Sequence, residues 1–391
     1  MIKNISPELK KTLFLIFIFQ FLSNTVSYIM FLNDGYYYVE RDYFKVNIEN
    51  TIYSYVAFLI CFIFILFSFF FTRRNIKPII INENKYSFII LFLQISYFII
   101  NIHYGINIAG QPGRKDLPAL LSLFFVIFNP DILFLIYLFF TKESKIKKIN
   151  IVVYLVSMSI RGWMAGILYV LLYYFITKKF KFRVYIILLL TMTLLLLSMP
   201  FIINAKWYLR SDDTRNFFDV IFNVKDYSAS LASSIEYLLL RFQHISSVMF
   251  ITDNLQFINF DSIKPYWAEG NFQLFFEKIF SIELQSINNY AVTNLLGYSN
   301  ADWNIHIGIE SWLIMYPFDL FLYIYIFMTI FFTNLLAIAK HSKLMQAFLL
   351  YMIFSRLFVG WNAAYINLII SLLVTMFILF LIKKINLKRS F

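Results

Sequence analysis

The chain has 391 residues, of which 60% are hydrophobic and only 14% are charged. This composition excludes an ordinary soluble globular protein, in which about 25% of residues are charged, and indicates a membrane protein. The formal net charge of +12 is not a nucleic-acid signal, because the Lys and Arg residues cluster beside hydrophobic runs, as the positive-inside rule describes.

Hydrophobic runs divide the chain, and each has about the 20 residues needed to cross a hydrocarbon core of about 30 Å. Within the fourth run, Pro130 should kink the helix because it removes a backbone hydrogen bond. The next residue, Asp131, is a candidate partner for an arginine. The six runs are residues 12–32, 51–72, 86–109, 117–140, 184–203 and 318–339.

The basic clusters set the predicted topology, because Lys and Arg concentrate in cytoplasmic loops. They lie at both ends of the chain, which predicts that both termini are cytoplasmic. The polar stretch 204–309 carries seven Lys and Arg against eleven Asp and Glu, and it is predicted to face outward. The chain therefore divides into a transmembrane bundle (1–203), a large outer loop (204–309) and a second transmembrane bundle (310–391).

A further apolar segment, residues 149–177, has basic residues on both flanks, so it must enter the membrane and return. Its two helices would each reach only about 21 Å at 1.5 Å per residue, too short for the whole core. Arg161 lies at the turn, and an unpaired Arg near the bilayer centre costs about 2.5–3.5 kcal/mol or more. We expect it to face a cavity open to the outside and to bind an anionic ligand. The alternatives are snorkelling to the interface and pairing with a carboxylate such as Asp131.

A second such hairpin, residues 344–382, is long enough for two full crossings. Arg356 at its turn lies nearer the interface, so snorkelling is the favoured interpretation, with ligand binding as the alternative. With the six runs and the two hairpins, the sequence predicts an all-α bundle of about ten spans.

The outer loop is predicted to contain an amphipathic helix over residues 228–255, since apolar residues recur there every three or four positions. Ser228 is its expected N-cap. Arg241 and His244 would lie near one face, as ligand-binding residues or as a solvated face, and the solvated face is favoured for His244. A second short helix is expected over residues 272–280, and the two helices would roof a cavity.

His306 stands where the loop returns to the membrane. An imidazole has an ordinary pKa near 6.5, which suits a general base near neutrality. Glu310, four residues later, could orient that ring on a helix. An interfacial histidine without chemistry is the alternative.

Several chemical signals are absent from the sequence: a phosphate-binding glycine loop, a dinucleotide fingerprint and a zinc-type cluster of Cys and His. The pair Asp212-Asp213 has Arg210 and Arg215 as its basic neighbours, which favours a solvated charge cluster over a metal site. Arg210 and Arg215 remain secondary candidates for substrate contact. No metal and no cofactor is expected.

The layout from about residue 148 to residue 317 resembles the O-antigen polymerase (Wzy-like) and O-antigen ligase group of bacterial polysaccharide-assembly membrane enzymes. The resemblance rests on the turn with Ser159, Arg161 and Gly162, on the helical Arg241 in a large outer loop, and on His306 before the next span.

This resemblance implies metal-independent glycosyl transfer at the periplasmic face of the bacterial inner membrane. The substrate would be an undecaprenyl-diphosphate-linked oligosaccharide, polymerised into O-antigen or capsule. Arg161 and Arg241 would hold the diphosphate, and His306 would activate the acceptor hydroxyl. A chain-length regulator in the membrane is a further implied partner, and nucleic acid is not. An O-antigen ligase, a flippase for the same lipid-linked sugars and a non-catalytic membrane assembly protein remain open as alternatives, as do the sugars joined, the linkage and the oligomeric state.

Overall fold

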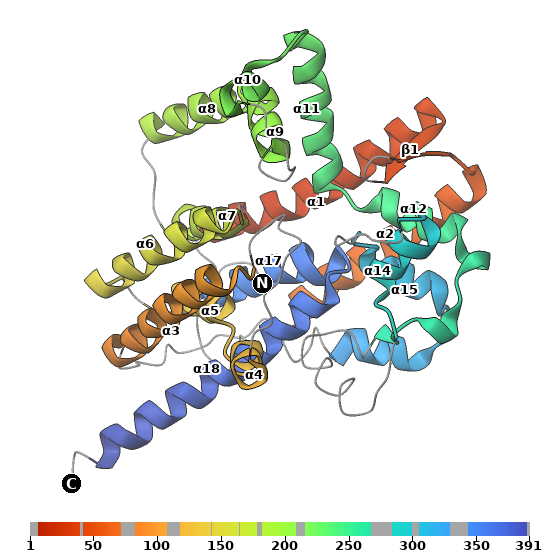
Figure 1. Ribbon diagram of the computed structural model, residues 1–391. Helices are drawn as coiled ribbons and strands as arrows, with labels where there is room; N and C mark the ends of the chain where they lie inside the picture. Colours follow the sequence, from red (N-terminus) through yellow and green to blue (C-terminus); the bar gives the residue numbers. More distant parts are fainter. Residues whose placement is uncertain are drawn as a thin grey trace.

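The computed structural model is almost entirely helical within the residues that it describes, which agrees with the predicted all-α class (Figure 1). Those residues are 7–39, 42–71, 83–107, 118–141, 143–163, 165–177, 182–208, 216–266, 284–298, 305–328 and 343–388. The first elements in chain order are α1 (Pro7–Asp34), β1 (Tyr36–Val39), β2 (Asp42–Lys45), α2 (Ile48–Phe71), α3 (Glu83–Tyr104), α4 (Ala119–Ile127), α5 (Pro130–Phe140), α6 (Lys145–Ile160), α7 (Ala165–Thr177), α8 (Phe182–Leu197) and α9 (Met199–Tyr208). The remaining elements are α10 (Phe217–Phe222), α11 (Tyr227–Phe242), α12 (Ile245–Asp253), η1 (Leu255–Phe257), η2 (Phe260–Ser262), α14 (Ile287–Tyr290), the π-helix η4 (Ala291–Leu295), α15 (Gly308–Met315), α17 (Lys343–Met352), the π-helix η5 (Ile353–Phe358) and α18 (Asn362–Lys388).

Five helices in the described ranges are long and apolar enough to cross a membrane. A shorter apolar helix covers Gly166–Phe175. These helices agree with a multi-pass membrane protein, whereas the count of ten spans and the sidedness stay predictions. The five candidate spans are Phe14–Asp34, Ile48–Phe67, Asn84–Tyr104, Leu123–Phe140 and Asn362–Ile382.

The helix α5 lies at the centre of the bundle, and all its side chains from Ile132 to Phe139 are buried. A helix that is apolar on every side has to be surrounded by other helices, and α3, α6, α17 and α18 pack against it. The side chain of Asn129 accepts a hydrogen bond from the Ile132 N–H, and Pro130 occupies the first turn, where its missing N–H costs nothing. The kink predicted at Pro130 is therefore confirmed, as a break between α4 and α5.

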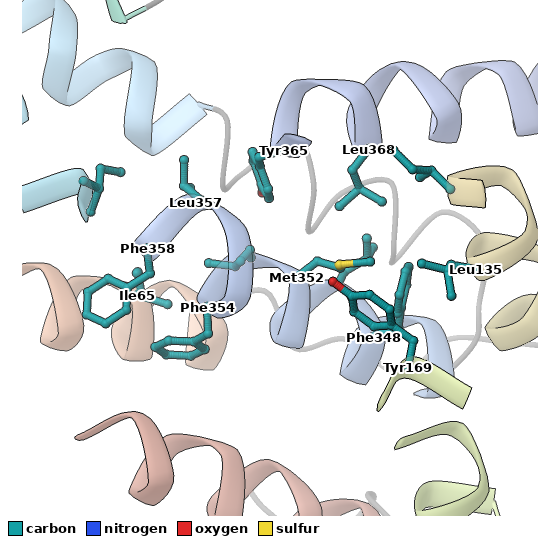
Figure 2. Packing of buried hydrophobic residues seen from close by; sticks show 14 of the residues in the cluster. Ile65, Leu135, Tyr169, Phe348, Met352, Phe354, Leu357, Phe358, Tyr365 and Leu368 are labelled. Atoms are coloured by element: carbon teal, nitrogen blue, oxygen red, sulfur yellow. The ribbon is translucent and has the colours of Figure 1, made fainter. Parts of the chain in front are cut away.

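The hairpin of α17, η5 and α18 completes the core. Figure 2 shows Phe348 and Met352 of α17 facing Tyr365 and Leu368 of α18. The Phe348 ring also stacks on Phe139 of α5, with centroids 4.5 Å apart. Apolar packing between α17, α18 and α5 therefore fixes the position of the turn of this hairpin.

The α6–α7 hairpin turns through a glycine and a tryptophan. Trp163 N–H donates to the Met158 carbonyl at 2.9 Å, and Gly162 N–H donates to Ser159 at 3.1 Å. This pair of bonds is the Schellman motif, which needs a left-handed residue after the helix, and Gly162 has φ +75°. The predicted turn at this glycine is confirmed.

The turn before α18 repeats the same motif. Trp361 N–H donates to the Arg356 carbonyl at 2.7 Å, and Gly360 N–H donates to Leu357 at 3.0 Å. Gly360 has φ +84°. The two hairpins thus turn through the same backbone motif, but Arg161 directly precedes its glycine, whereas Arg356 contributes the carbonyl that accepts from Trp361.

The predicted single helix 228–255 is wrong, because the structure breaks it into α11 and α12 at Gln243 and His244. Asn24 of α1 stabilises the break, because its side-chain oxygen accepts hydrogen bonds from the backbone N–H groups of His244 and Ile245 at 2.9 and 3.1 Å. The N-cap of α11 is Asp226 and not Ser228: its carboxylate accepts from the Ala229 N–H at 3.1 Å.

The helices α11 and α12 differ in how deeply they are buried in the protein. In α12, side chains such as Val248, Met249 and Phe250 are buried, and α1, α2 and α15 pack around it. Its last residue, Asp253, accepts hydrogen bonds from Tyr37 of β1 at 2.7 Å and Asn50 of α2 at 2.8 Å. By contrast, α11 projects from α1 beside α9 and α10 (Figure 1). The β1–β2 hairpin that helps to anchor α12 was not predicted from the sequence.

Candidate functional site

A cavity of about 100 Å³ lies where α11 and α12 meet the turn after η5. Its wall combines parts of β1, α11, α12, the segment before α15 and the η5 turn, so it exists only in the folded chain. Two of the four histidines in the chain line this one cavity. The lining residues are Tyr38, Val39, Tyr237, Gln243, His244, Ser246, Ser247, Ile305, His306 and Val359.

His244 is the buried histidine of the pair. It is 2% exposed, and its Nε2 lies 3.1 Å from Oε1 of Glu310, which is fully buried. The rings of Phe58 and Phe358 enclose the imidazole, with centroids 6.0 and 4.8 Å away. The prediction that His244 lies on a solvated face is wrong, because α12 is inserted into the core.

Glu310 therefore contacts His244, and the expectation that it orients His306 is not met. The reason is the path of the backbone before α15. Gly308 N–H donates to the Val359 carbonyl at 3.0 Å, and a Cβ on Gly360 would collide with the Gly308 nitrogen. This close approach turns Glu310 inward and places His306 against the η5 turn.

His306 is partly exposed and lines the cavity. Its ring lies against the indole of Trp361, with centroids 5.1 Å apart and planes tilted by 33°. A general base has to come within hydrogen-bond reach of the proton it removes. Of the two histidines, His306 has the more accessible position for that task.

Arg356 contacts the same indole, with its Cζ 5.7 Å from the ring centroid of Trp361. The side chain is 7% exposed, so the predicted snorkelling to an interface is wrong. Its Nη1 donates to the Ala364 carbonyl at 2.8 Å, because α18 folds back beside it. Within the described ranges, Nε has no hydrogen-bond partner and no carboxylate pairs with this guanidinium.

Arg161 is in a different situation. It is 1% exposed, and its Nη1 and Nη2 donate to both carboxylate oxygens of Asp131 at 2.9 and 2.8 Å. Its Nε donates to Ser157, and its Cζ lies 5.3 Å from the Tyr97 ring centroid. The expectation of a cavity open to the outside is not met here, because the break before α5 places Asp131 at the turn. Of the three interpretations of Arg161 that the sequence left open, the structure agrees with the pairing with Asp131.

The two hairpin turns belong to one buried polar region. Tyr154 of α6 is buried and interacts electrostatically with Asp131, Arg161 and Arg356. The region thus contains two guanidinium groups and, among the described residues, one carboxylate.

Several predicted residues cannot be placed. Arg241 lies in the last turn of α11, but its side chain is outside the described part. Arg210, Arg215 and the predicted helix 272–280 also lie outside the described residues. Their functional roles stay predictions.

Sequence reasoning placed Trp361 at the second hairpin turn but gave no role to this residue, which contacts both His306 and Arg356. The repeated Gly-Trp pair that follows each hairpin arginine is the signal that could have found it. It also missed Asn24, which holds the break between α11 and α12. No sequence signal connects Asn24 to His244, because 220 positions separate them.

The arrangement offers a proton acceptor at the cavity wall, His306, and an indole, Trp361, that contacts both this histidine and the buried cation Arg356. Among the residues that the structure describes, no group of three or more His, Cys, Asp or Glu could hold a metal ion. No protein-family model, no curated protein and no solved structure matches this chain.

Proposed function

We propose that this protein is a membrane glycosyltransferase that polymerises undecaprenyl-diphosphate-linked oligosaccharide units at the periplasmic face of the bacterial inner membrane. The observation that carries the proposal is that His306 and Arg356 both contact the indole of Trp361. That contact supplies a base and a cation at adjoining positions, as transfer from a diphosphate requires.

In the proposed reaction, a hydroxyl of the acceptor sugar attacks the anomeric carbon of the donor sugar. The bond between that carbon and the diphosphate oxygen breaks, and the lipid diphosphate leaves with the electron pair. The hydroxyl proton passes to the imidazole of His306. Arg356 stabilises the negative charge that develops on the leaving group, because a preorganised cation in a poorly hydrated site favours such a transition state.

Arg356 suits this role better than Arg161. A guanidinium binds phosphate oxygens through two parallel N–H groups. Asp131 occupies both terminal nitrogens of Arg161, whereas Nε of Arg356 has no partner in the described part of the chain. We therefore propose that Arg356 binds the diphosphate, and that Arg161, paired with Asp131, stabilises the first hairpin turn. Arg241 remains a second proposed diphosphate ligand from the sequence.

The buried pair of His244 and Glu310 acts on His306 indirectly in this proposal. Glu310 is four residues from His306, and its contact with His244 joins the start of α15 to the start of α12. The pair holds the backbone that carries His306 at the cavity wall. His244 and Glu310 are thus positioning residues.

The test is chain growth by the purified protein in proteoliposomes with a lipid-diphosphate-linked oligosaccharide, resolved on a gel. His306→Ala should lower turnover by about 10²–10⁴-fold, the usual contribution of a general base, while binding of the donor lipid survives. His103→Ala is the matched control, because that imidazole is exposed at the end of α3. Translocation of the lipid without chain growth would identify a flippase, and wild-type turnover in the His306 variant would remove the base assignment.

A further inference from the structure

A second, larger cavity of about 520 Å³ lies between α9 and α11. The two helices pack side by side, with α10 against α9 (Figure 1). The part of the wall contributed by α11 is one helix face, since its residues follow one another at spacings of three and four. The polar residues of that face are Ser230, Ser233, Ser234 and Tyr237. Two asparagines also line the cavity: Asn204 from α9, and Asn223 from the segment after α10.

The lining combines hydroxyl and amide groups with four apolar residues, and it is electrically balanced; the apolar residues are Pro200, Ile203, Val224 and Ala229. It contains one cation, Lys225, and one anion, Asp226. Backbone donation from Ala229 and the hydroxyl of Ser228 hold the pKa of the Asp226 carboxyl below its ordinary value, so it stays charged near neutral pH. A groove without excess charge offers little to an anionic lipid headgroup, while hydroxyls and amides match a neutral polyhydroxylated ligand.

The serine hydroxyls are prepared to accept hydrogen bonds. Ser233 donates to the Ala229 carbonyl at 3.0 Å, and Ser234 donates to the Ser230 carbonyl at 2.6 Å. A hydroxyl that donates to its own helix keeps its oxygen lone pairs as acceptors. A sugar hydroxyl could therefore donate to these oxygens without breaking the helix bonds.

Tyr237 connects this groove to the candidate functional site. It lines both the groove and the cavity that holds His306. From Ser230 to Tyr237 the helix rises about 10 Å at 1.5 Å per residue, which is the length of a short oligosaccharide. A ligand along this face would end beside the proposed base.

We propose that the groove between α9 and α11 binds a neutral oligosaccharide and directs its end past Tyr237 to His306. The assignment of this oligosaccharide as the acceptor rests on the proposed function. The binding itself does not, because it follows from the size, polarity and charge balance of the groove.

The test uses the full-length protein in nanodiscs and, as probe, the neutral oligosaccharide released by mild acid from the surface polysaccharide of the source bacterium. Saturation-transfer NMR and a titration measure its binding. Ser233→Leu, which fills the groove, should weaken binding at least tenfold. Ala232→Leu is the matched control, because it adds the same side chain at an exposed neighbouring position outside the groove.

His306→Ala separates this proposal from the proposed function, since it should strongly lower turnover while the probe still binds along the face of α11. If Ser233→Leu loses binding and the wild-type protein transfers no sugar, the groove binds an oligosaccharide but the proposed glycosyltransferase function is wrong. Equal binding by the Ser233→Leu and Ala232→Leu proteins would overturn the groove, as would failure of the wild-type protein to bind the probe at millimolar concentration. Displacement of the probe by uncharged lipid alone would show that the groove holds acyl chains instead.

Discussion

The two hairpin turns share one backbone motif and differ in what surrounds their arginines. Each has a glycine with positive φ followed by a tryptophan, and the same pair of hydrogen bonds closes each helix. At the first turn, Arg161 is fully engaged by Asp131. At the second, Arg356 has a carbonyl and an indole as its partners in the described structure.

This difference shows that an arginine at a hairpin turn is not by itself a ligand-binding residue. Burial of a cation next to a carboxylate satisfies the cation, and such a pair needs no further partner. Burial beside neutral groups leaves a charge that an anion can satisfy. We therefore interpret the first turn as structural and the second as functional, and substitutions at four places in the two turns test this interpretation.

The largest effect is expected from Asp131→Ala. It leaves Arg161 buried without a counter-ion, and such a change destabilises a protein by about 3–5 kcal/mol. Equilibrium unfolding of the purified protein in bicelles measures the change in free energy. An unchanged unfolding midpoint would contradict a structural role for the first turn.

The control for this prediction is the double change Asp131→Ala with Arg161→Met. It removes both charges and should recover most of the lost stability, since no unpaired charge remains. Arg161→Ala alone should cost less than Asp131→Ala, because the Asp131 side chain is 21% exposed and can meet water.

The second prediction concerns Arg356→Gln. Loss of a group that stabilises developing charge typically lowers turnover by about 10²–10³-fold, or about 2.7–4 kcal/mol. The unfolding free energy should stay the same or rise, because the change removes a buried charge without a carboxylate partner. Arg356→Lys should recover only part of the activity, since an ammonium has no planar fork. A loss of stability without loss of turnover would assign the second turn to structure as well. Lys145→Gln, on an exposed side chain, is the control.

The third prediction uses the two turn glycines. Gly162→Ala should cost about 1–2 kcal/mol, the strain of a left-handed alanine. Gly360→Ala should cost at least about 1 kcal/mol more from overpacking, because its Cβ would collide with the Gly308 backbone. Unfolding measurements on both variants compare the two costs. Equal costs would mean that the second turn can move away from α15.

The smallest effect is expected at the two tryptophans. Trp361→Leu removes a cation–π contact worth about 0.5–2 kcal/mol, which corresponds to about a 2- to 30-fold loss of turnover. Trp163→Leu should leave turnover unchanged, because its indole donates to the Asn107 carbonyl and contacts neither His306 nor Arg356. Steady-state kinetics at equal protein abundance measure both. Equal losses would show that the tryptophans act only on the shape of the turns.

Much of the fold could be predicted because it depends on local patterns. Apolar runs of sufficient length marked the helices, Pro130 marked the break before α5, and Gly162 marked a turn. The periodicity of residues 228–255 was also real, but it continued through a break that Asn24 stabilises from α1. A period of three and four reports which residues share a face and does not report whether the helix is continuous.

The candidate site was predicted in its residue types and less well in their pairings. Apolar runs and charge clusters predicted a helical membrane protein with charged residues at two hairpin turns and a histidine before α15. The packing of the folded chain was needed to show that Asp131 satisfies Arg161, that Glu310 turns to His244, and that Arg356 has no carboxylate among the described residues. These pairings depend on groups that lie far apart along the chain. Helix propensity and turns depend on neighbours within a few residues, whereas the partner of a buried charge is whichever group the packing of distant helices brings within about 3 Å.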